Sequence, residues 1–353
     1  MTRQDILDAV RDRRPIKGAD LSGLDLSGAD LSGVLFEKVS FKGASLAGAV
    51  VKDAGFRKCD FSGAILDGCD LTKMNLSKTS FAGASLKNIT TQMTLLGGSD
   101  FTGADLSGAR LYWSVVDKAT LAGANLTGAV LEKLTLRNSN LSKAILAGAA
   151  FVKAILTGCN LTGVSFKDVR FEKTLLTGCD LSGQDFTGLT LAQVNLSGSN
   201  LTGAKFVNAR LNYCHLGKAN LEGADFTGAD GSKSMYLGAS LKGAKLAGGT
   251  FTNSVFSEAE LGAVDFSGAA LFKCAFVKAK CRGAKFTGCD LRHADFSNAD
   301  CTAADFSRAD MTMANLHMML DEHALYDMTN RVLVRPTNKE MAEAQSFRPV
   351  KSA

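Results

Sequence analysis

Cysteine and histidine are the residues of this chain with the broadest chemistry, because both bind metals and both act in nucleophilic or acid–base catalysis. The chain of 353 residues contains nine cysteines and four histidines. The histidines are His215, His293, His317 and His323, and no metal-ligand spacing appears among them. No Ser-His-Asp or Cys-His arrangement is indicated, and no glycine-rich stretch continues as Gly-Lys-Ser or Gly-Lys-Thr. The sequence therefore predicts no catalytic site, no metal site and no cofactor.

Apolar residues recur in this sequence with a period of five residues, and this repeat determines where the cysteines and histidines lie. From Leu21 to Leu316, Leu or Phe occupies every fifth position with only eight exceptions, and a small residue, usually Ala, lies two positions before each. The period fits neither a helix nor a continuous strand. It fits a short extended stretch that points two alternate side chains inward and is followed by a corner. We therefore predict a coil in which the Leu or Phe and the small residue face the core.

All nine cysteines fall on these inward positions. We expect each to behave as a small buried hydrophobe. The pairs Cys159/Cys179 and Cys281/Cys301 would lie one coil apart, within reach of a disulfide, but no feature of the chain indicates an oxidising compartment. The histidines fall on different columns of the repeat or near its C-terminal end, and we expect them to face solvent.

Comparing each repeat with the fourth repeat after it separates the repeats into four classes. The corner residue is Gly in 12 of 15 repeats of the class that begins at Gly23 and in 11 of 15 of the class at Gly28. It is Gly once in the class at Gly33 and five times in the class at Lys38. Phenylalanines also recur at this four-repeat lag. These patterns predict a four-sided coil with one repeat on each side, and we call the four classes the first to fourth sides.

The sequence resembles the pentapeptide-repeat family, whose motif is A(D/N)LXX, as in Ala19–Gly23 and Ala104–Gly108, which both read ADLSG. The resemblance covers residues 19–318. It implies an all-β solenoid, a right-handed quadrilateral β-helix of about 15 coils with short helical caps. A helix over residues 2–14, N-capped by Thr2, is expected to cover the first coil as part of an N-terminal cap of residues 1–18.

Residues 319–353 are expected to form a C-terminal cap and a polar tail. Methionines and leucines cluster where the repeat fades, between Met311 and Met328. They predict either a helical or irregular cap or an apolar end that binds a second copy of the chain. The stretch from Thr337 to Ala353 is polar, which favours disorder or ordering by a partner.

The composition excludes several classes of protein. Hydrophobic residues make up 46% and charged residues 21% of the chain, which predicts an ordered core. No uncharged apolar run reaches the roughly 18 residues that a membrane-spanning helix needs, so no such helix is expected. The charged N-terminal residues do not form a secretory signal peptide, so we expect a cytoplasmic protein, with secretion by a route independent of a signal peptide left open. A net charge of +5 is well below that of a dedicated nucleic-acid coat.

The third and fourth sides depart from the polar outer surface of the other two. Apolar or aromatic residues occupy outward positions there, among them Leu95, Tyr112, Trp113, Val115, Ile155, Leu175 and Tyr213. Apolar stripes of this length mark contact surfaces, unless lysine stems or a loop cover them. Lysines recur beside this stripe, namely Lys133, Lys153 and Lys173 on the third side and Lys38, Lys58 and Lys78 on the fourth. They predict either a solvated face or a site for an acidic partner.

Two stretches break the pattern of inward residues. In residues 88–98 and 229–238 the inward Leu or Phe is replaced by Thr91, Gly231 and Tyr236. We predict local loops or bends at both, which would offer further docking features.

These features favour a non-enzymatic scaffold or adaptor that binds another protein, or a second copy of itself, through its third and fourth sides. Residues 16–28 also resemble repeat arrays that accompany bacterial type VI secretion loci, where the protein would be an accessory or cargo-linked module. A nucleic-acid binder that uses the lysines and the Tyr112–Trp113 pair is an alternative, although one Trp and four Tyr argue against it. One branch of the family imitates duplex DNA with an acidic dimeric rod and protects DNA gyrase, and a net charge of +5 argues against that role here.

Overall fold

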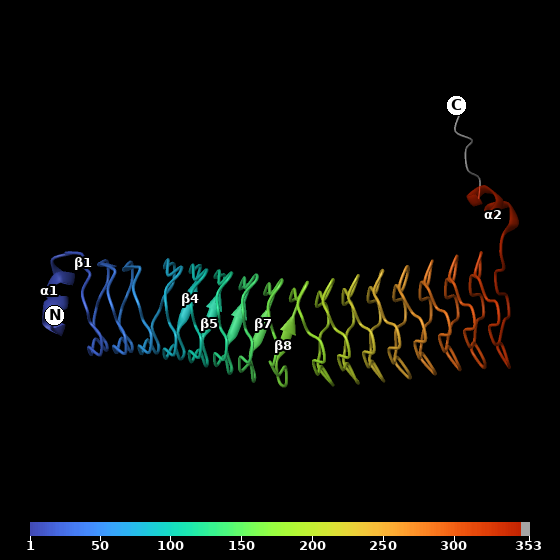
Figure 1. Cartoon of the computed structure of the whole chain (residues 1–353), viewed down its shortest axis with the longest axis horizontal. Coiled ribbons are helices and arrows are strands. Elements are labelled where there is room, and N and C mark those ends of the chain that lie inside the picture. The colour runs from blue at the N-terminus through green and yellow to red at the C-terminus, as the bar shows by residue number, and fades with distance from the viewer. Residues whose placement is uncertain (347–353) are drawn as a thin grey trace, which may run out of the picture. The chain divides into compact units, whose positions relative to one another are not determined.

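The structure is a computed structural model and describes residues 1–346. The chain divides into two compact units, Met1–Leu181 and Ser182–Ala353. In each unit the backbone winds in turns that stack one on the next (Figure 1). Within each unit most repeats pair with the fourth repeat after them, so each turn is one coil of four repeats, as the lag in the sequence predicts.

The N-terminal unit is a β-solenoid of about eight turns. Its ladder that starts at Asp20 pairs in parallel with Ser40 and advances by one coil at a time to Asp180. Longer pairings form two parallel sheets. The first contains β1 (Ile16–Lys17), β2 (Leu35–Glu37) and β3 (Gly55–Arg57). The second contains β4 (Thr90–Gln92), β5 (Arg110–Tyr112), β6 (Val130–Glu132), β7 (Ala150–Val152) and β8 (Arg170–Glu172).

The repeat Ala19–Gly23 illustrates why five residues make one side. The Leu21 N–H donates to the carbonyl of Ser40 at 2.8 Å, and the Ser40 N–H donates back to the Ala19 carbonyl at 3.0 Å. The Asp20 carboxylate accepts a hydrogen bond from the backbone N–H two residues later, which closes the turn. Gly23 then has a φ of +68°, a left-handed conformation that glycine adopts without a steric cost.

Helix α1 (Arg3–Arg11) covers the first coil; it has the expected Thr2 cap and is shorter than the predicted helix of residues 2–14. The Thr2 hydroxyl accepts from the Asp5 N–H at 3.2 Å, and the Asp5 carboxylate accepts from the Thr2 N–H at 2.7 Å. Ile6 is fully buried. The Arg3 guanidinium donates to the carbonyl of Asp25 at 3.1 Å, so α1 is fastened to the coil beneath it.

The core of each unit consists of the predicted inward residues. Phenylalanines of successive coils stack face to face, with ring centres 4.8 Å apart for Phe41 and Phe61 in the N-terminal unit. In the C-terminal unit the rings of Phe206 and Phe226 lie 4.5 Å apart. Each coil therefore buries its apolar side chains against the coils on either side of it.

The C-terminal unit continues the same ladder geometry beyond the expected end of the repeat at residue 318. Asp300 pairs with Leu320, and Asn315 pairs with Arg335. The ladder persists because main-chain hydrogen bonds do not require an apolar inward residue. Helix α2 (Lys339–Ser346) follows, so part of the tail expected to be disordered is helical. The Asn338 side chain accepts from the Met341 N–H at 3.0 Å and caps α2, and the expectation for residues 347–353 lies outside the described residues.

The prediction of loops at residues 88–98 and 229–238 is wrong. Both stretches keep the regular pairing, with Thr90 paired with Arg110 in β5 and Asp230 paired with Thr250. The buried Thr91 hydroxyl lies 3.0 Å from the hydroxyl of Ser114, so its polar group is satisfied inside the core. The space above Gly231 is filled by neighbouring aromatic side chains.

Candidate functional site

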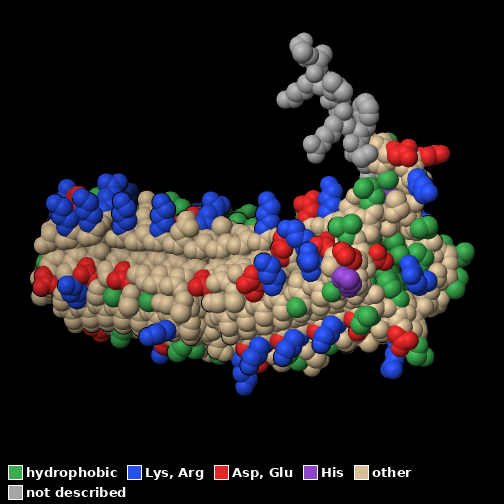
Figure 2. Space-filling view, turned by 45° about the vertical axis from the view of Figure 1, so that its right-hand side comes forward, with side chains coloured by type: hydrophobic (Ala, Val, Ile, Leu, Met, Phe, Trp, Pro, Cys, Tyr) green, Lys and Arg blue, Asp and Glu red, His purple; other side chains and the backbone are tan. Residues whose placement is uncertain are grey.

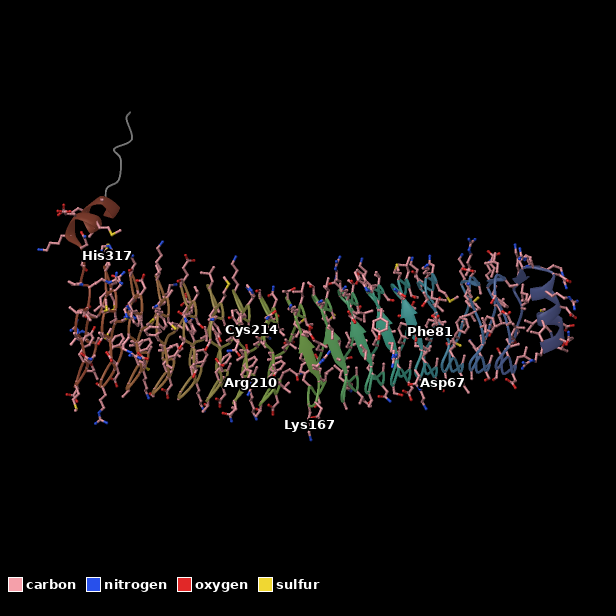
Figure 3. The ribbon with its side chains drawn as sticks, turned by 180° about the vertical axis from the view of Figure 1, so that it is seen from behind. Asp67, Phe81, Lys167, Arg210, Cys214 and His317 are labelled. Atoms are coloured by element: carbon pink, nitrogen blue, oxygen red, sulfur yellow. The ribbon has the colours of Figure 1, made fainter. Side chains whose placement is uncertain are left out.

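The cysteines lie in the core, as predicted, and do not present a reactive thiol. All nine are buried. The Cys214 sulfur lies 2.8 Å from the carbonyl oxygen of Leu191. Burial raises the pKa of the Cys214 thiol to about 12, so the nucleophilic thiolate is scarce at neutral pH. In Figure 3 the Phe81 ring lies within its coil, whereas Lys167 lies at an outer edge.

The prediction of solvent-facing histidines is wrong for His317. This side chain is buried, and its Nδ1 accepts a hydrogen bond from the Asn338 N–H at 3.2 Å (Figure 3). His215 and His323 are exposed, and His293 is half-buried. Within residues 1–346 no group of three His, Cys, Asp or Glu side chains is placed to hold a metal ion. His317 instead fastens the segment that leads to α2.

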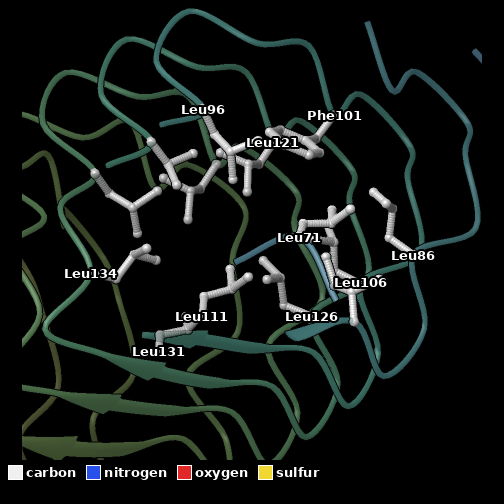
Figure 4. Close-up of a pocket in the computed structure, with 14 residues that line it drawn as sticks. Leu71, Leu86, Leu96, Phe101, Leu106, Leu111, Leu121, Leu126, Leu131 and Leu134 are labelled. Atoms are coloured by element: carbon white, nitrogen blue, oxygen red, sulfur yellow. The ribbon is translucent and has the colours of Figure 1, made fainter. Parts of the chain in front are cut away.

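A narrow gap lies between the stacked leucines of the N-terminal unit (Figure 4). Its volume is about 10 Å³, and its lining is apolar, with side chains such as Leu71, Leu106 and Leu131. A space of this size holds at most one water molecule, and an apolar lining gives that water no hydrogen-bond partner. The gap therefore cannot hold a substrate.

The predicted third-side residues lie along one edge of the sheet β4–β8. Trp113, Lys133, Lys153 and Lys173 directly follow β5, β6, β7 and β8. These strands pair in register from one coil to the next, so the four residues occupy equivalent positions in successive coils. Met93 occupies the same position after β4. We call Met93, Trp113, Lys133, Lys153 and Lys173 the corner ladder.

Every residue of the corner ladder has a left-handed backbone. The φ angle is +53° at Met93, +52° at Trp113, Lys133 and Lys153, and +49° at Lys173. This conformation costs a residue with a side chain roughly 1 kcal/mol, whereas glycine adopts it freely. On the first side the equivalent corner is Gly in 12 of 15 repeats. Non-glycine residues adopt the same conformation at corners throughout the chain, so the strain distinguishes the corner ladder from the glycine-rich first side and not from the rest of the third side.

Trp113 is the only tryptophan of the chain and is 55% exposed. The Lys133 Nζ lies 3.7 Å from the centre of its ring, a cation–π contact that orders both side chains. Tyr112, the last residue of β5, is half-buried on the adjoining sheet face. Within residues 1–346, Lys133, Lys153 and Lys173 form no ion pair, whereas the nearby Arg170 lies 3.8 Å from the Glu172 carboxylate. Three cations of the corner ladder are therefore uncompensated.

The predicted fourth-side residues form a second ladder. Leu95, Val115, Thr135, Ile155 and Leu175 pair in parallel in successive coils, and we call them the aliphatic ladder. Leu95 is 45% exposed, and the other four are half-buried. Each follows a residue of the corner ladder by two positions, so the two ladders run side by side. Together they make a surface that is apolar along one line and largely cationic along the next.

Tyr213, the remaining predicted site residue, lies in the C-terminal unit. It is 50% exposed, its φ is +61°, and its hydroxyl accepts a hydrogen bond from the Lys233 Nζ at 3.0 Å. This hydrogen bond raises the pKa of the Lys233 ammonium group. The pair repeats in this unit the aromatic–lysine arrangement of Trp113 and Lys133.

The predicted fourth-side lysines, Lys38, Lys58 and Lys78, also occupy left-handed corners in successive coils. The residues two positions after them are Ser40, Asp60 and Ser80, which form a polar ladder. They therefore lack the aliphatic neighbours of the corner ladder. Figure 2 shows Lys and Arg side chains gathered in rows along edges of the visible face.

A charge ladder on the second side of the C-terminal unit was missed by sequence reasoning. Its residues pair in successive coils and alternate in sign, in the order Asp185, Lys205, Asp225, Lys245, Asp265, Lys285 and Asp305. Neighbouring charges attract, whereas a register that skipped one coil would pair like charges. The alternation is visible in the sequence when the outward residues of this side are compared at intervals of four repeats.

The last coil inverts the usual pattern of apolar inside and polar outside. At inward positions, the Tyr326 hydroxyl donates to the Asp321 carboxylate at 2.7 Å, and the Arg331 guanidinium lies 4.5 Å from the Tyr326 ring centre. At outward positions five apolar side chains are exposed, namely Leu320, Leu325, Met328, Val332 and Leu333. Figure 2 shows hydrophobic side chains gathered at this end of the C-terminal unit.

Family models for pentapeptide repeats match most of the chain. The model for pentapeptide repeats (8 copies) matches residues 17–53, 54–90, 94–123, 124–163, 238–271 and 274–317, and the model for a pentapeptide repeat region matches residues 149–226. The chain belongs to the pentapeptide-repeat family. The structure and the family assignment agree on a β-solenoid built from five-residue units.

Several solved structures of pentapeptide-repeat proteins are similar to this one. HetL, involved in heterocyst differentiation regulation in the cyanobacterium Nostoc sp. strain PCC 7120, is 26% identical over 75% of this chain and 96% of its own, with a TM-score of 0.25. A protein of the Arabidopsis thaliana thylakoid lumen is 34% identical over 33% of this chain and 70% of its own, with a TM-score of 0.16. Full-length QnrB1, a plasmid-mediated fluoroquinolone resistance protein, is 21% identical over 57% of this chain and 92% of its own, with a TM-score of 0.25.

No curated protein matches this pentapeptide-repeat chain. Neither α1 nor α2, the helices among residues 1–346, has the length and hydrophobicity that a membrane-spanning helix requires.

Proposed function

We propose that this pentapeptide-repeat protein is a non-enzymatic scaffold or adaptor, and that it binds a partner protein through the corner ladder and the aliphatic ladder. The observation that carries the proposal is Trp113, a large aromatic side chain that is 55% exposed in a left-handed corner that glycine would fill without strain. Exposed aromatic residues beside aliphatic ones are typical of the centre of a protein interface. Repeat proteins bind through extended faces of this kind.

The test is affinity purification with the triple variant Leu95→Asp/Ile155→Asp/Leu175→Asp. Binding would remove water from three carboxylates on the aliphatic ladder without supplying opposite charges to pair with them, so the variant should no longer bind the protein. The matched control is Ile65→Asp/Ile145→Asp, which changes two exposed isoleucines of the second side. A bound protein and an oligomeric state that are the same for wild type, triple variant and control would contradict the proposal. Circular dichroism melts establish that all three proteins fold.

The last coil supports a second contact, between two copies of the chain. Its five exposed apolar residues include Met328, which is 76% exposed, and they lie on the coil at which the backbone ladder ends among residues 1–346. A second copy would cover both the edge and the apolar side chains. Light scattering of Leu325→Asp/Leu333→Asp tests this step, because the variant should be a monomer at concentrations at which the wild type is a dimer. A wild-type protein that is monomeric at about 100 μM would exclude it.

Two finer expectations belong to the same proposal, and one alternative to it remains. We take the 60 repeats to make 15 coils in all, with a right-handed quadrilateral cross-section. A narrower form of the adaptor function is an accessory module of a bacterial type VI secretion system, and the genes beside this one test it. The gyrase-protecting alternative predicts inhibition in a supercoiling assay, which the adaptor function does not.

A further inference from the structure

We infer that the corner ladder binds an acidic, extended segment of the partner protein, with one apolar residue at one end of its run of carboxylates. This inference rests on the proposed function and names the chemistry of the partner. It follows from the charge of the face, from the order of residues along the ladder and from the length of the ladder.

The face formed by β5–β8 and the residues directly after them carries an excess of positive charge. It contains five cations and two carboxylates, a net charge of +3, from Arg110, Lys133, Lys153, Arg170 and Lys173 against Glu132 and Glu172. Arg170 and Glu172 form the only ion pair among these residues within the described chain, and both side chains are largely exposed. Successive rungs of a solenoid are about 4.8 Å apart, so the lysines repel one another and attract an anionic ligand.

The ladder also has a direction. Met93 and Trp113 form its apolar end, and Lys133, Lys153 and Lys173 follow in the next three coils. Leu95 and Val115 of the aliphatic ladder lie beside the apolar end. A bound segment would therefore place an apolar residue near Met93 and Trp113 and its carboxylates near the lysines.

The length of the ladder sets the length of the segment. Four steps separate Met93 from Lys173, or about 19 Å at about 4.8 Å a step. An extended chain rises about 3.3 Å per residue, so about six residues span this distance. Alternate residues of such a segment face the ladder, which brings two or three carboxylates within reach of the flexible lysine side chains.

Nucleic acid fits this surface less well. A single-stranded nucleic acid needs open aromatic rings on which its bases stack. The corner ladder has one such ring, and the Lys133 Nζ already lies 3.7 Å above it. An acidic peptide therefore fits the corner ladder better than a nucleic acid does.

The only tryptophan of the chain lies within the proposed site, so its fluorescence reports binding directly. The probe is a capped peptide of one leucine followed by five alternating glutamates and aspartates. We expect a saturable change in Trp113 emission. The variant Lys133→Glu/Lys153→Glu/Lys173→Glu should bind the peptide at least tenfold more weakly, as judged by the quenching of a fluorophore on the peptide. The matched control Lys38→Glu/Lys58→Glu/Lys78→Glu reverses three stacked lysines that lack aliphatic neighbours and should change the affinity less than twofold.

Four outcomes would overturn the inference. They are no response to the peptide, equal loss of affinity in the two triple variants, equal affinity for a peptide whose leucine is replaced by glutamate, and tighter binding of oligothymidylate than of the peptide. The proposed function is judged separately. If the partner protein does not bind the aliphatic-ladder variant but still binds the Lys133/Lys153/Lys173 variant, the adaptor function stands and the inference of an acidic segment is wrong.

Discussion

Gly231 makes room for Tyr236. A Cβ atom on Gly231 would lie 2.7 Å from the Tyr236 hydroxyl oxygen, closer than any such contact in a relaxed structure. The two residues are the inward positions of consecutive repeats, and one lacks a side chain where the other carries an oversized one. The Tyr236 hydroxyl is buried and has no hydrogen-bond partner among residues 1–346.

Removing that hydroxyl should stabilise the protein. An unsatisfied buried polar group costs about 1–3 kcal/mol, so we expect Tyr236→Phe to raise the free energy of unfolding by about 1 kcal/mol. Gly231→Ala should lower it, because the new Cβ meets the Tyr236 hydroxyl and the Phe251 ring. Urea denaturation measures both. The double variant, which combines the added Cβ with the shorter ring, should be less destabilised than Gly231→Ala alone, and a larger loss would contradict this explanation.

The same pair explains a limit of sequence reasoning. The five-residue period identifies the buried residues, including all nine cysteines, because two inward positions recur in every repeat. The pattern predicts the type of each inward residue independently, whereas the side chains of neighbouring repeats share the space in the core. Gly231 and Tyr236 therefore look like a break in the pattern although together they fill one layer. Thr91 misleads in the same way, because its partner Ser114 lies 23 residues away.

The backbone ladder extends beyond the predicted end of the repeats at residue 318 for a different reason. The apolar signal fades after residue 318 because Asp321, Tyr326 and Arg331 occupy inward positions of the last coil. The backbone ladder does not depend on that signal and continues to Arg335. The corner ladder and the aliphatic ladder, in contrast, could be assigned to their sides from the four-repeat lag. The left-handed backbone at the lysine corners could not, because Lys alone gives no sign of a positive φ.

The alternating charge ladder predicts a defined response to charge reversal. Lys245→Asp places an aspartate between Asp225 and Asp265, so three like charges stack in successive coils. We expect a loss of about 1 kcal/mol in the free energy of unfolding, smaller at about 1 M salt because the repulsion is screened. Lys218→Asp is the matched control, since its neighbours in the same column are Gly198 and Gly238. Equal effects of the two changes would exclude an electrostatic role for the ladder.

The turn carboxylates predict how stability depends on pH. Hydrogen bonds from the serine two residues later lower the pKa values of Asp20, Asp25 and Asp30. A lowered pKa in the folded state means that the unfolded chain binds protons first, so this stabilisation is complete above about pH 4 and is lost as the pH falls through the folded-state values. Thermal melts between pH 7 and pH 2.5 should show the loss.

An asparagine variant isolates this effect. Asn75 and Asn140 accept the same turn hydrogen bond elsewhere in the chain. Asp20→Asn/Asp25→Asn/Asp30→Asn should therefore fold, and its melting temperature should fall less than that of the wild type between pH 5 and pH 2.5. If the two proteins lose stability in parallel, other carboxylates account for the acid sensitivity.

Because the thiols are buried, we predict that the cysteines do not react with thiol reagents in the folded protein. Burial raises the pKa of Cys274 to about 12, so its thiolate fraction at pH 8 is roughly a thousandfold below that of a thiol at the ordinary value. We expect a thiol reagent at pH 8 to label none of the cysteines of the folded protein and all nine after denaturation. The variant Lys218→Cys adds an exposed thiol and should react at once. Rapid labelling of any native cysteine would show that its coil opens.

The strained corners predict a conflict between stability and binding. Lys153 has a φ of +52°, and replacing it by glycine relieves a cost of roughly 1 kcal/mol, partly offset by the greater freedom of glycine in the unfolded chain. We expect Lys153→Gly to raise the free energy of unfolding by about 0.5 kcal/mol and to weaken binding of the acidic peptide, since it removes one of three cations. Gly103→Ala, at a first-side corner with a φ of +65° and open space around it, is the converse control and should destabilise the protein. If Lys153→Gly instead destabilised the protein, the lysine would be retained for folding, and the strain at the corner ladder would no longer indicate a binding role.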